Sequence, residues 1–186
     1  FERALERVRK TGSRSGEAAI LGDLGNCHRA IAALPKAIEY HEAALRIHRD
    51  IGLREGEATA LGNLGICYAA LGELSKAIEH HEAALQIARE IGSREEEASN
   101  LGNLGICYGI LRDLQRSLEH HEAALRIHRE IGSREAEAGD LANLGNCYAI
   151  LDNHRMALEY HEAALRIHRE IGSREGEASD LGNIGN

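Results

Sequence analysis

The sequence has few aromatic residues and almost no proline. Only 3% of its residues are aromatic, tryptophan is absent, and the one proline is Pro35. The chain is rich instead in alanine, leucine, glutamate and arginine, which are good helix formers. We therefore expect helices that pack through small side chains. With 43% hydrophobic and 28% charged residues, the 186-residue chain has the composition of a folded soluble protein with a continuous core.

Other absences exclude whole classes of function. The net charge is −8 and no basic stretch is present, which argues against a nucleic-acid partner. No apolar run approaches the roughly 18–20 residues of a membrane span, so we expect no membrane partner. The sequence contains neither a glycine-rich phosphate loop nor a nucleophile–base arrangement. We therefore expect no enzyme activity, no catalytic residue and no cofactor.

What the sequence does contain is a 40-residue block that recurs almost verbatim. The pentapeptide His-Glu-Ala-Ala-Leu begins at His41, His81, His121 and His161. Leu-Gly recurs at 24, 64, 104 and 144, and Ile-Gly at 51, 91, 131 and 171. A fixed period of this size predicts a solenoid, in which each unit buries its apolar face against its neighbours.

Each repeat carries two apolar stripes at helical spacing. In one repeat the first stripe ends at Gly72 and the second at Gly92, and Ser93 is a candidate N-cap for the next helix, as are Ser13, Ser133 and Ser173. We predict two antiparallel helices of about 17 residues per repeat. The whole chain, 1–186, then forms one array. Four full repeats span 13–52, 53–92, 93–132 and 133–172, flanked by a partial second helix at 1–12 and the start of a first helix at 173–186.

The cysteines and histidines are also spaced one repeat apart. Equivalent positions in stacked repeats lie roughly 8–10 Å apart, which is too far for a disulfide or for a shared zinc ion. We therefore interpret both sets as core residues, and expect no metal site. Reduced thiols point to a cytoplasmic location. Burial of the imidazoles predicts a fold that is sensitive to acid near pH 6. The cysteines are Cys27, Cys67, Cys107 and Cys147.

The pattern resembles the tetratricopeptide repeat. Leu61, Leu64, Gly65, Tyr68 and Ala77 fall at the spacing of that family's signature. The other three copies repeat the spacing, with His28 in place of the tyrosine in the first copy and Ser117 in place of the alanine in the third. The chain departs from the family in having no closing proline and a period of 40 rather than about 34. This long variant is similar to the Leu-Gly-Asn-rich (Pins-type) G-protein signalling modulators, and to long repeats in bacterial multidomain regulators. The modulators' Gα-binding motifs are absent, so Gα binding is not implied.

The resemblance implies an all-α, right-handed superhelical solenoid, in which the first helices line a concave, peptide-binding groove. The groove positions map to Asp23, Asn26, Asn63, Ile66, Asn103, Ile106, Asn143 and Asn146. The asparagines would either bind a peptide backbone or stiffen the stack by bonding the next repeat. Gly22, Gly62 and Gly102 would either floor the groove or permit tight helix packing. No lysine or arginine stands at the mapped positions, so a carboxylate clamp is not expected.

The two ends of the chain suggest a second function. We expect Phe1, Leu5 and Val8 at one end, and Leu181 and Ile184 at the other, to be exposed. Either the chain is a fragment of a longer array, or its half-repeats stack head to tail into a homo-oligomer or fibre. Two function classes remain: an adaptor scaffold with a protein or peptide partner, and a self-assembling structural module.

Overall fold

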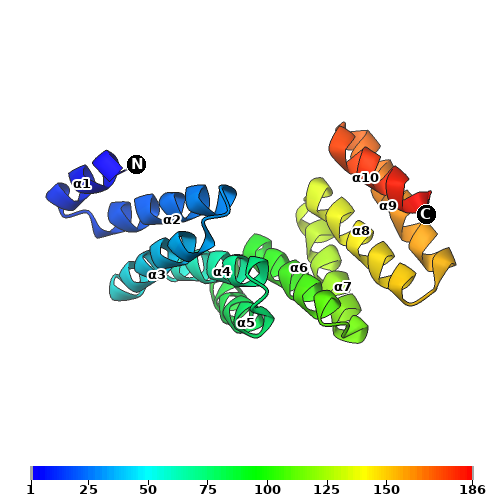
Figure 1. Cartoon of the computed structure of the whole chain (residues 1–186), viewed down its shortest axis with the longest axis horizontal. Coiled ribbons are helices and arrows are strands. Elements are labelled where there is room, and N and C mark those ends of the chain that lie inside the picture. Colours follow the sequence, from blue (N-terminus) through cyan, green and yellow to red (C-terminus); the bar gives the residue numbers. More distant parts are fainter. Residues whose placement is uncertain (1, 186) are drawn as a thin grey trace. The chain divides into compact units, whose positions relative to one another are not determined.

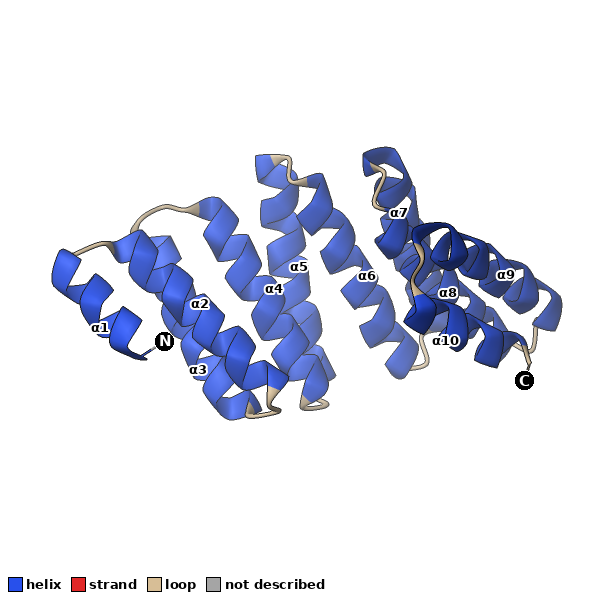
Figure 2. Ribbon diagram, turned by 90° about the horizontal axis from the view of Figure 1, so that it is seen from above, coloured by secondary structure: helices blue, strands red, loops and turns tan. Residues whose placement is uncertain are grey.

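The computed structural model describes residues 2–185, and the side chains of residues 5–185. This part of the chain contains ten α-helices and no strand (Figures 1 and 2), which confirms the all-α prediction. The first five are α1 (Glu2–Thr11), α2 (Arg14–Ala30), α3 (Leu34–Asp50), α4 (Arg54–Ala70) and α5 (Leu74–Ile91). The second five are α6 (Arg94–Ile110), α7 (Leu114–Ile131), α8 (Arg134–Ile150), α9 (His154–Ile171) and α10 (Arg174–Ile184).

The helices pack mainly against their neighbours in sequence. The chain divides into two compact units, Phe1–Glu96 (unit 1) and Glu97–Asn186 (unit 2). In unit 1, α2 packs on α3, α3 on α4 and α4 on α5. In unit 2, α7 packs on α8, α8 on α9 and α9 on α10. Within each unit the predicted helical hairpins are therefore present, and their helices have the expected length of 17 or 18 residues.

Glycines end the second helix of the repeats. Gly92, Gly132 and Gly172 are C-caps with φ of 72–74°, a left-handed conformation that glycine adopts without a steric penalty. The predicted N-caps are only partly correct. Ser13 accepts a hydrogen bond from the Gly16 amide, whereas the side chains of Ser133 and Ser173 occupy the N-cap position without that bond.

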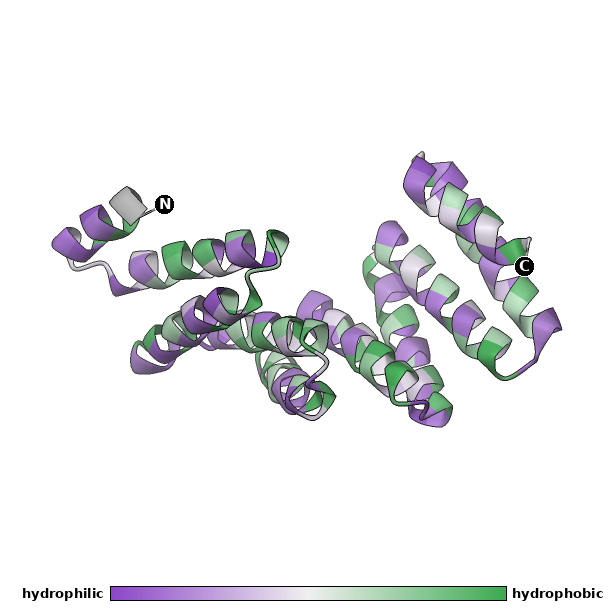
Figure 3. Ribbon diagram, viewed as in Figure 1, coloured by the Kyte–Doolittle hydropathy of each residue, from purple (hydrophilic) through white to green (hydrophobic). Residues whose placement is uncertain are grey.

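The core is built from leucines and small side chains. In unit 1 the central cluster joins Leu45, Leu61, Leu64 and Ile87 with fully buried alanines, and unit 2 repeats it with Leu125, Leu141, Leu144 and Ile167. Figure 3 shows hydrophobic and hydrophilic residues alternating along the same helices. Because the alanines let helix axes approach closely, the core needs few aromatic side chains.

The histidines of the recurring pentapeptide are core residues, as predicted. His41, His81, His121 and His161 are 0–3% exposed. Each imidazole lies against the glycine of the Leu-Gly pair in the preceding helix. A methyl group on Gly25, Gly65, Gly105 or Gly145 would come within 2.5–2.8 Å of ring atoms. The recurring glycine and histidine are thus two halves of one contact.

Three of the four cysteines are buried, and the prediction is wrong for Cys27, which is exposed. The Sγ of Cys147 lies 3.2 Å from the Ser117 Oγ, a residue thirty positions earlier. Cys67 and Cys107 are almost fully buried, whereas Cys27 on α2 is open to solvent.

The end residues are less exposed than the sequence predicts. Leu5 is half-buried against a cluster containing Ala18, Leu21 and Ile47. Val8 and Ile184 are also half-buried, whereas Leu181 is 46% exposed, as expected. The correction arises because α1 packs on α2 through the same apolar positions that a complete second helix uses. Phe1 lies outside the described residues.

Buried glutamates form ion pairs with arginines and so link successive helices. The sequence interpretation did not predict these ion pairs. Glu57 accepts hydrogen bonds from Arg49 Nε at 2.8 Å and Arg54 Nη1 at 2.7 Å, and Arg54 also binds Glu90. Burial alone raises the pKa of Glu57, but the two arginines outweigh it and hold the pKa below its usual value. The signal was available, because an arginine stands eight residues before a glutamate in every copy.

Candidate functional site

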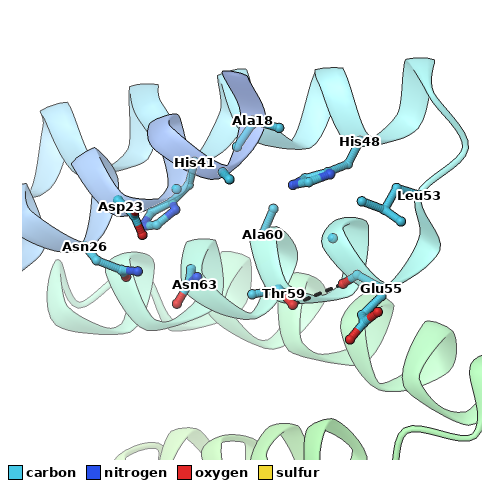
Figure 4. Close-up of a pocket in the computed structure, with 14 residues that line it drawn as sticks. Ala18, Asp23, Asn26, His41, His48, Leu53, Glu55, Thr59, Ala60 and Asn63 are labelled. Carbon is cyan, nitrogen blue, oxygen red and sulfur yellow. Dashed lines mark hydrogen bonds between the residues drawn. The ribbon is translucent and has the colours of Figure 1, made fainter. Parts of the chain in front are cut away.

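A cavity of about 350 Å³ lies in unit 1 between α2 and α4, with α3 beneath it (Figure 4). Asp23 and Asn26 reach it from α2, and Thr59 and Asn63 reach it from α4. His41 and His48 come from α3. Three of the predicted groove residues, Asp23, Asn26 and Asn63, are thus brought together around one cavity.

Three polar side chains at the rim of this cavity are unpaired. The side chains of Asp23, Asn26 and Asn63 make no hydrogen bond or ion pair with any other described residue. The same holds for Asn103, Asn143 and Asn146. The asparagines therefore do not stiffen the stack by bonding the neighbouring repeat. Their amides, each with donors and an acceptor, are available to an added chain.

The floor of the cavity holds two neutral imidazoles. His41 is fully buried and neither of its ring nitrogens has a partner. Burial, with a smaller effect of the Arg29 charge, lowers the pKa of His41 to about 4. Burial also lowers the pKa of His48, whose Nδ1 is likewise buried without a partner. Unpaired buried nitrogens of this kind carry a desolvation cost that a ligand can relieve.

The cavity exists because small residues line it. Its lining includes Ala44, Gly56 and Ala60. In unit 2 the position of Ala60 is taken by Asp140, whose Oδ2 lies 2.7 Å from the Nδ1 of His128, the counterpart of His48. Alanine at position 60 leaves both the space and the unpaired imidazole. A Cβ on Gly22 would meet nothing within 4 Å, so this glycine lies on open surface rather than in a tight packing contact.

The lining of this cavity carries only negative charge. Asp23 and Glu55 are the acidic residues of the lining, and no lysine or arginine is among the lining residues. The Glu55 carboxylate points away from the cavity, so Asp23 supplies its negative charge (Figure 4). The Thr59 hydroxyl lies 3.0 Å from the Glu55 carbonyl oxygen and 2.5 Å from Glu96 Oε1, and these two acceptors share its single proton, so it is already occupied.

A second cavity, of about 510 Å³, lies in unit 2 between α6 and α8, with α7 beneath it. It gathers three more of the predicted groove residues, Ile106, Asn143 and Asn146. Its lining is otherwise different, with Ile110 and Ile150, no carboxylate and one cation, Arg112. Ile66 and Asn103 line neither of these two cavities.

Sequence reasoning did not include His48 or Glu55 in the site. His48 follows His41 by seven residues, which places both on one face of α3. That spacing was sufficient to find His48. The effect of Ala60 was not foreseeable, because it depends on what the equivalent position contacts in the folded chain.

Two further properties concern the described residues as a whole. Among them no group of three or more histidine, cysteine, aspartate or glutamate side chains is arranged to hold a metal ion. None of their helices combines the length and apolar character needed to cross a membrane.

Comparison with known families identifies the repeat. Two tetratricopeptide-repeat models match the chain, one over residues 56–130 and one over residues 141–171. Together they cover more than half of the sequence. The chain therefore contains tetratricopeptide repeats, as its sequence predicts. No curated protein matches the chain.

Solved structures share the fold at low sequence identity. BtubC from P. vanneervenii is 24% identical with a TM-score of 0.77, over 87% of this chain and 66% of that one. Aspartyl phosphate phosphatase F from Bacillus subtilis is 14% identical with a TM-score of 0.87, over 91% and 44%. A Rap protein complexed with competence and sporulation factor is 17% identical with a TM-score of 0.84, over 89% and 46%. This chain thus spans less than two thirds of each of these three proteins.

Proposed function

We propose that these tetratricopeptide repeats form a non-enzymatic protein-interaction scaffold that binds an extended or helical peptide segment along its α2–α4 and α6–α8 faces. One observation carries the proposal: polar side chains without partners border a cavity in each unit, at the predicted groove positions. Asp23 and Asn26 are exposed and Asn63 is half-buried, so their polar groups are accessible to an added chain. Side chains and backbone of a peptide would supply partners for them, with affinity spread over many small contacts.

The comparisons support this function at the level of fold. One similar structure is a Rap protein complexed with competence and sporulation factor, so a related helical array holds a bound factor. We extend the analogy no further, because the identity is 17%. Three sequence-based expectations remain predictions: the similarity to the Pins-type modulators, the organisation of residues 1–186 as one repeat array, and a cytoplasmic location.

The test is retention of a peptide library by the immobilised protein. We expect the wild type to retain peptides from a random decapeptide library, and Asn26→Ala combined with Asn63→Ala to lose most of that retention. Both asparagines are unpaired in the fold, so their removal costs little stability. Gln86→Ala is the control, because Gln86 is exposed on α5, lines neither cavity and bonds only Glu90 of the same helix. Equal retention by the wild type and the asparagine variant would contradict the proposal.

A second candidate function is end-to-end stacking of copies into a fibre. The exposed side chain of Leu181 on α10 favours it, since an apolar surface residue can pack against another chain. Leu5 and Val8 do not, because both are half-buried within their own chain. Sedimentation at rising protein concentration tests this candidate. A mass that stays monomeric throughout rules it out, and growth that Leu181→Glu abolishes supports it.

A further inference from the structure

The cavity of unit 1 combines a negative rim with a floor of hydrogen-bond acceptors. Asp23 has no partner among the described residues, and Glu55 stands at the edge of the same cavity. The two histidines of the floor are neutral near pH 7, so they add no positive charge, and each has a nitrogen that can accept a hydrogen bond. The cation whose charge acts on His41 is Arg29, which is exposed and does not line the cavity.

A ligand that covers this cavity must compensate the Asp23 carboxylate. Burying a carboxylate against an apolar or acidic group leaves an unpaired charge, which is strongly unfavourable. A donor group that carries a positive charge both pairs with Asp23 and supplies protons to the acceptors of Asn26, Asn63 and His48. Lysine and arginine are the side chains with several donors, no acceptor and a long stem.

We propose that the cavity bordered by Asp23, Asn26 and Asn63 selects a lysine or arginine side chain of the bound peptide. This specificity rests on the proposed peptide-binding function and narrows it to a partner segment with a basic residue at one fixed position. The acidic net charge of the chain, −8, favours the approach of such a segment.

Comparison of the repeats assigns the specificity to unit 1. The position of Asp23 is occupied by asparagine in the three following full repeats, at 63, 103 and 143. In unit 2 the counterpart of Asp23 is Asn103, which does not line the cavity, and the charged residue in that lining is Arg112. That cavity suits an apolar side chain between Ile106 and Ile110, and repels a basic one.

The experiment uses a positional-scanning library of decapeptides with acetylated N-termini and amidated C-termini, so that no terminal charge competes. At each position lysine and arginine are compared with norleucine, which keeps the alkyl stem of lysine and lacks its ammonium group. We expect the wild type to bind peptides with the basic residue about tenfold more tightly than those with norleucine at one position. A tenfold ratio in affinity corresponds to about 1.4 kcal/mol, which is typical of a charge-assisted hydrogen bond. Asp23→Asn should reduce that preference to within about twofold.

Asp23→Asn should fold, because asparagine already occupies this position in the other full repeats. Asp23→Ala gives an independent second variant, and a melting curve for each confirms the folded state. Asp152→Asn is the matched control, because it removes an exposed carboxylate that lines neither cavity and should leave the preference at this position unchanged.

The outcomes separate this inference from the proposed function. Peptides retained without any basic preference, or a preference that survives in both Asp23 variants, overturn the inference and leave peptide binding intact. If the wild type retains no peptide at all, peptide binding and the basic specificity are both overturned. Loss of the preference in both Asp23 variants, with retention of other peptides, supports the inference.

Discussion

At the scale of single residues, the most constrained contact is between the glycine of the Leu-Gly pair and the histidine of the pentapeptide. The imidazole takes the space in which a Cβ would stand. The family's aromatic position is thereby filled by a smaller polar ring that still packs against backbone. A histidine in this place also adds a titratable group to the core, which an aromatic hydrocarbon would not.

Substitution of this glycine tests the contact. Gly65→Ala places a methyl group 2.6 Å from the Nε2 of His81, so we expect a loss of about 1–3 kcal/mol in the free energy of unfolding, as for other overpacked cores. Urea unfolding followed by circular dichroism measures it. Gly22→Ala is the control, because nothing lies within 4 Å and alanine favours the helix by up to about 1 kcal/mol. A neutral Gly65→Ala would show that the imidazole moves freely.

The pH dependence of stability is also decided at single residues. The pKa of His41 is about 4 in the fold, against about 6.5 when unfolded. The folded state favours the neutral form, so this stability is fully present above pH 6.5 and is lost as the pH falls towards 4. The linkage relation gives a loss of about 2 kcal/mol between pH 7.5 and pH 5.

Melting curves across that range measure the effect of His41. Carboxylates such as Glu57 also make the fold less stable in acid. Their pKa is held low in the fold, and protonation breaks their ion pairs. We therefore compare His41→Leu, which should show a smaller decline between pH 7.5 and pH 5, with exposed His154→Leu, which should decline like the wild type. Equal declines in all three proteins would remove His41 as the cause.

At the scale of helices, the second helix of a repeat is joined to the next first helix by different side chains in different copies. In unit 2, His128 of α7 is paired with Asp140 of α8, and His168 of α9 with Asp180 of α10, both at 2.7 Å. In unit 1 the equivalent pair is His48 and Ala60, which leaves the cavity. The same two helix faces can therefore pack with a buried hydrogen bond between them, as in unit 2, or with a cavity between them, as in unit 1.

Asp140→Ala reproduces in unit 2 the combination of His48 and Ala60. The variant should fold, and we expect it to lose about 1–3 kcal/mol in the free energy of unfolding, because the buried Nδ1 of His128 is left without a partner. Denaturant titration measures this, with exposed Glu162→Ala on α9 as a control of little expected effect. No change in stability would mean that water replaces the carboxylate.

At the scale of the whole molecule, near-identical repeats give two units with different cavities. Unit 1 presents the Asp23 carboxylate and unpaired imidazoles, and unit 2 presents isoleucines and Arg112. The difference comes from a few positions at which the copies diverge, among them 23 and 60, while the leucines of the core clusters stay constant. Repeats that conserve their stacking contacts can thus vary their exposed faces without cost to the fold.

The sequence by itself determined the helices, their pairing and the core. Helix ends at Gly92, Gly132 and Gly172 follow from the glycines. The 40-residue spacing separates the cysteines and the pentapeptide histidines, all of which are core residues except Cys27. These features follow from local periodicity and from repetition, and both can be recognised in a single sequence. The mapped groove positions were also predictable in part, since Asp23, Asn26 and Asn63 do border one cavity.

Only the tertiary structure decided which of the mapped positions border a cavity and why. The cavity of unit 1 depends on Ala60 facing His48 across two helices, and the sequence records neither that proximity nor the missing partner. In the same way Cys27 is exposed and Leu5 is half-buried, because burial depends on which neighbouring helix is present to cover a side chain. Periodicity fixes which face of a helix is apolar, whereas packing between helices decides where space and unpaired groups remain.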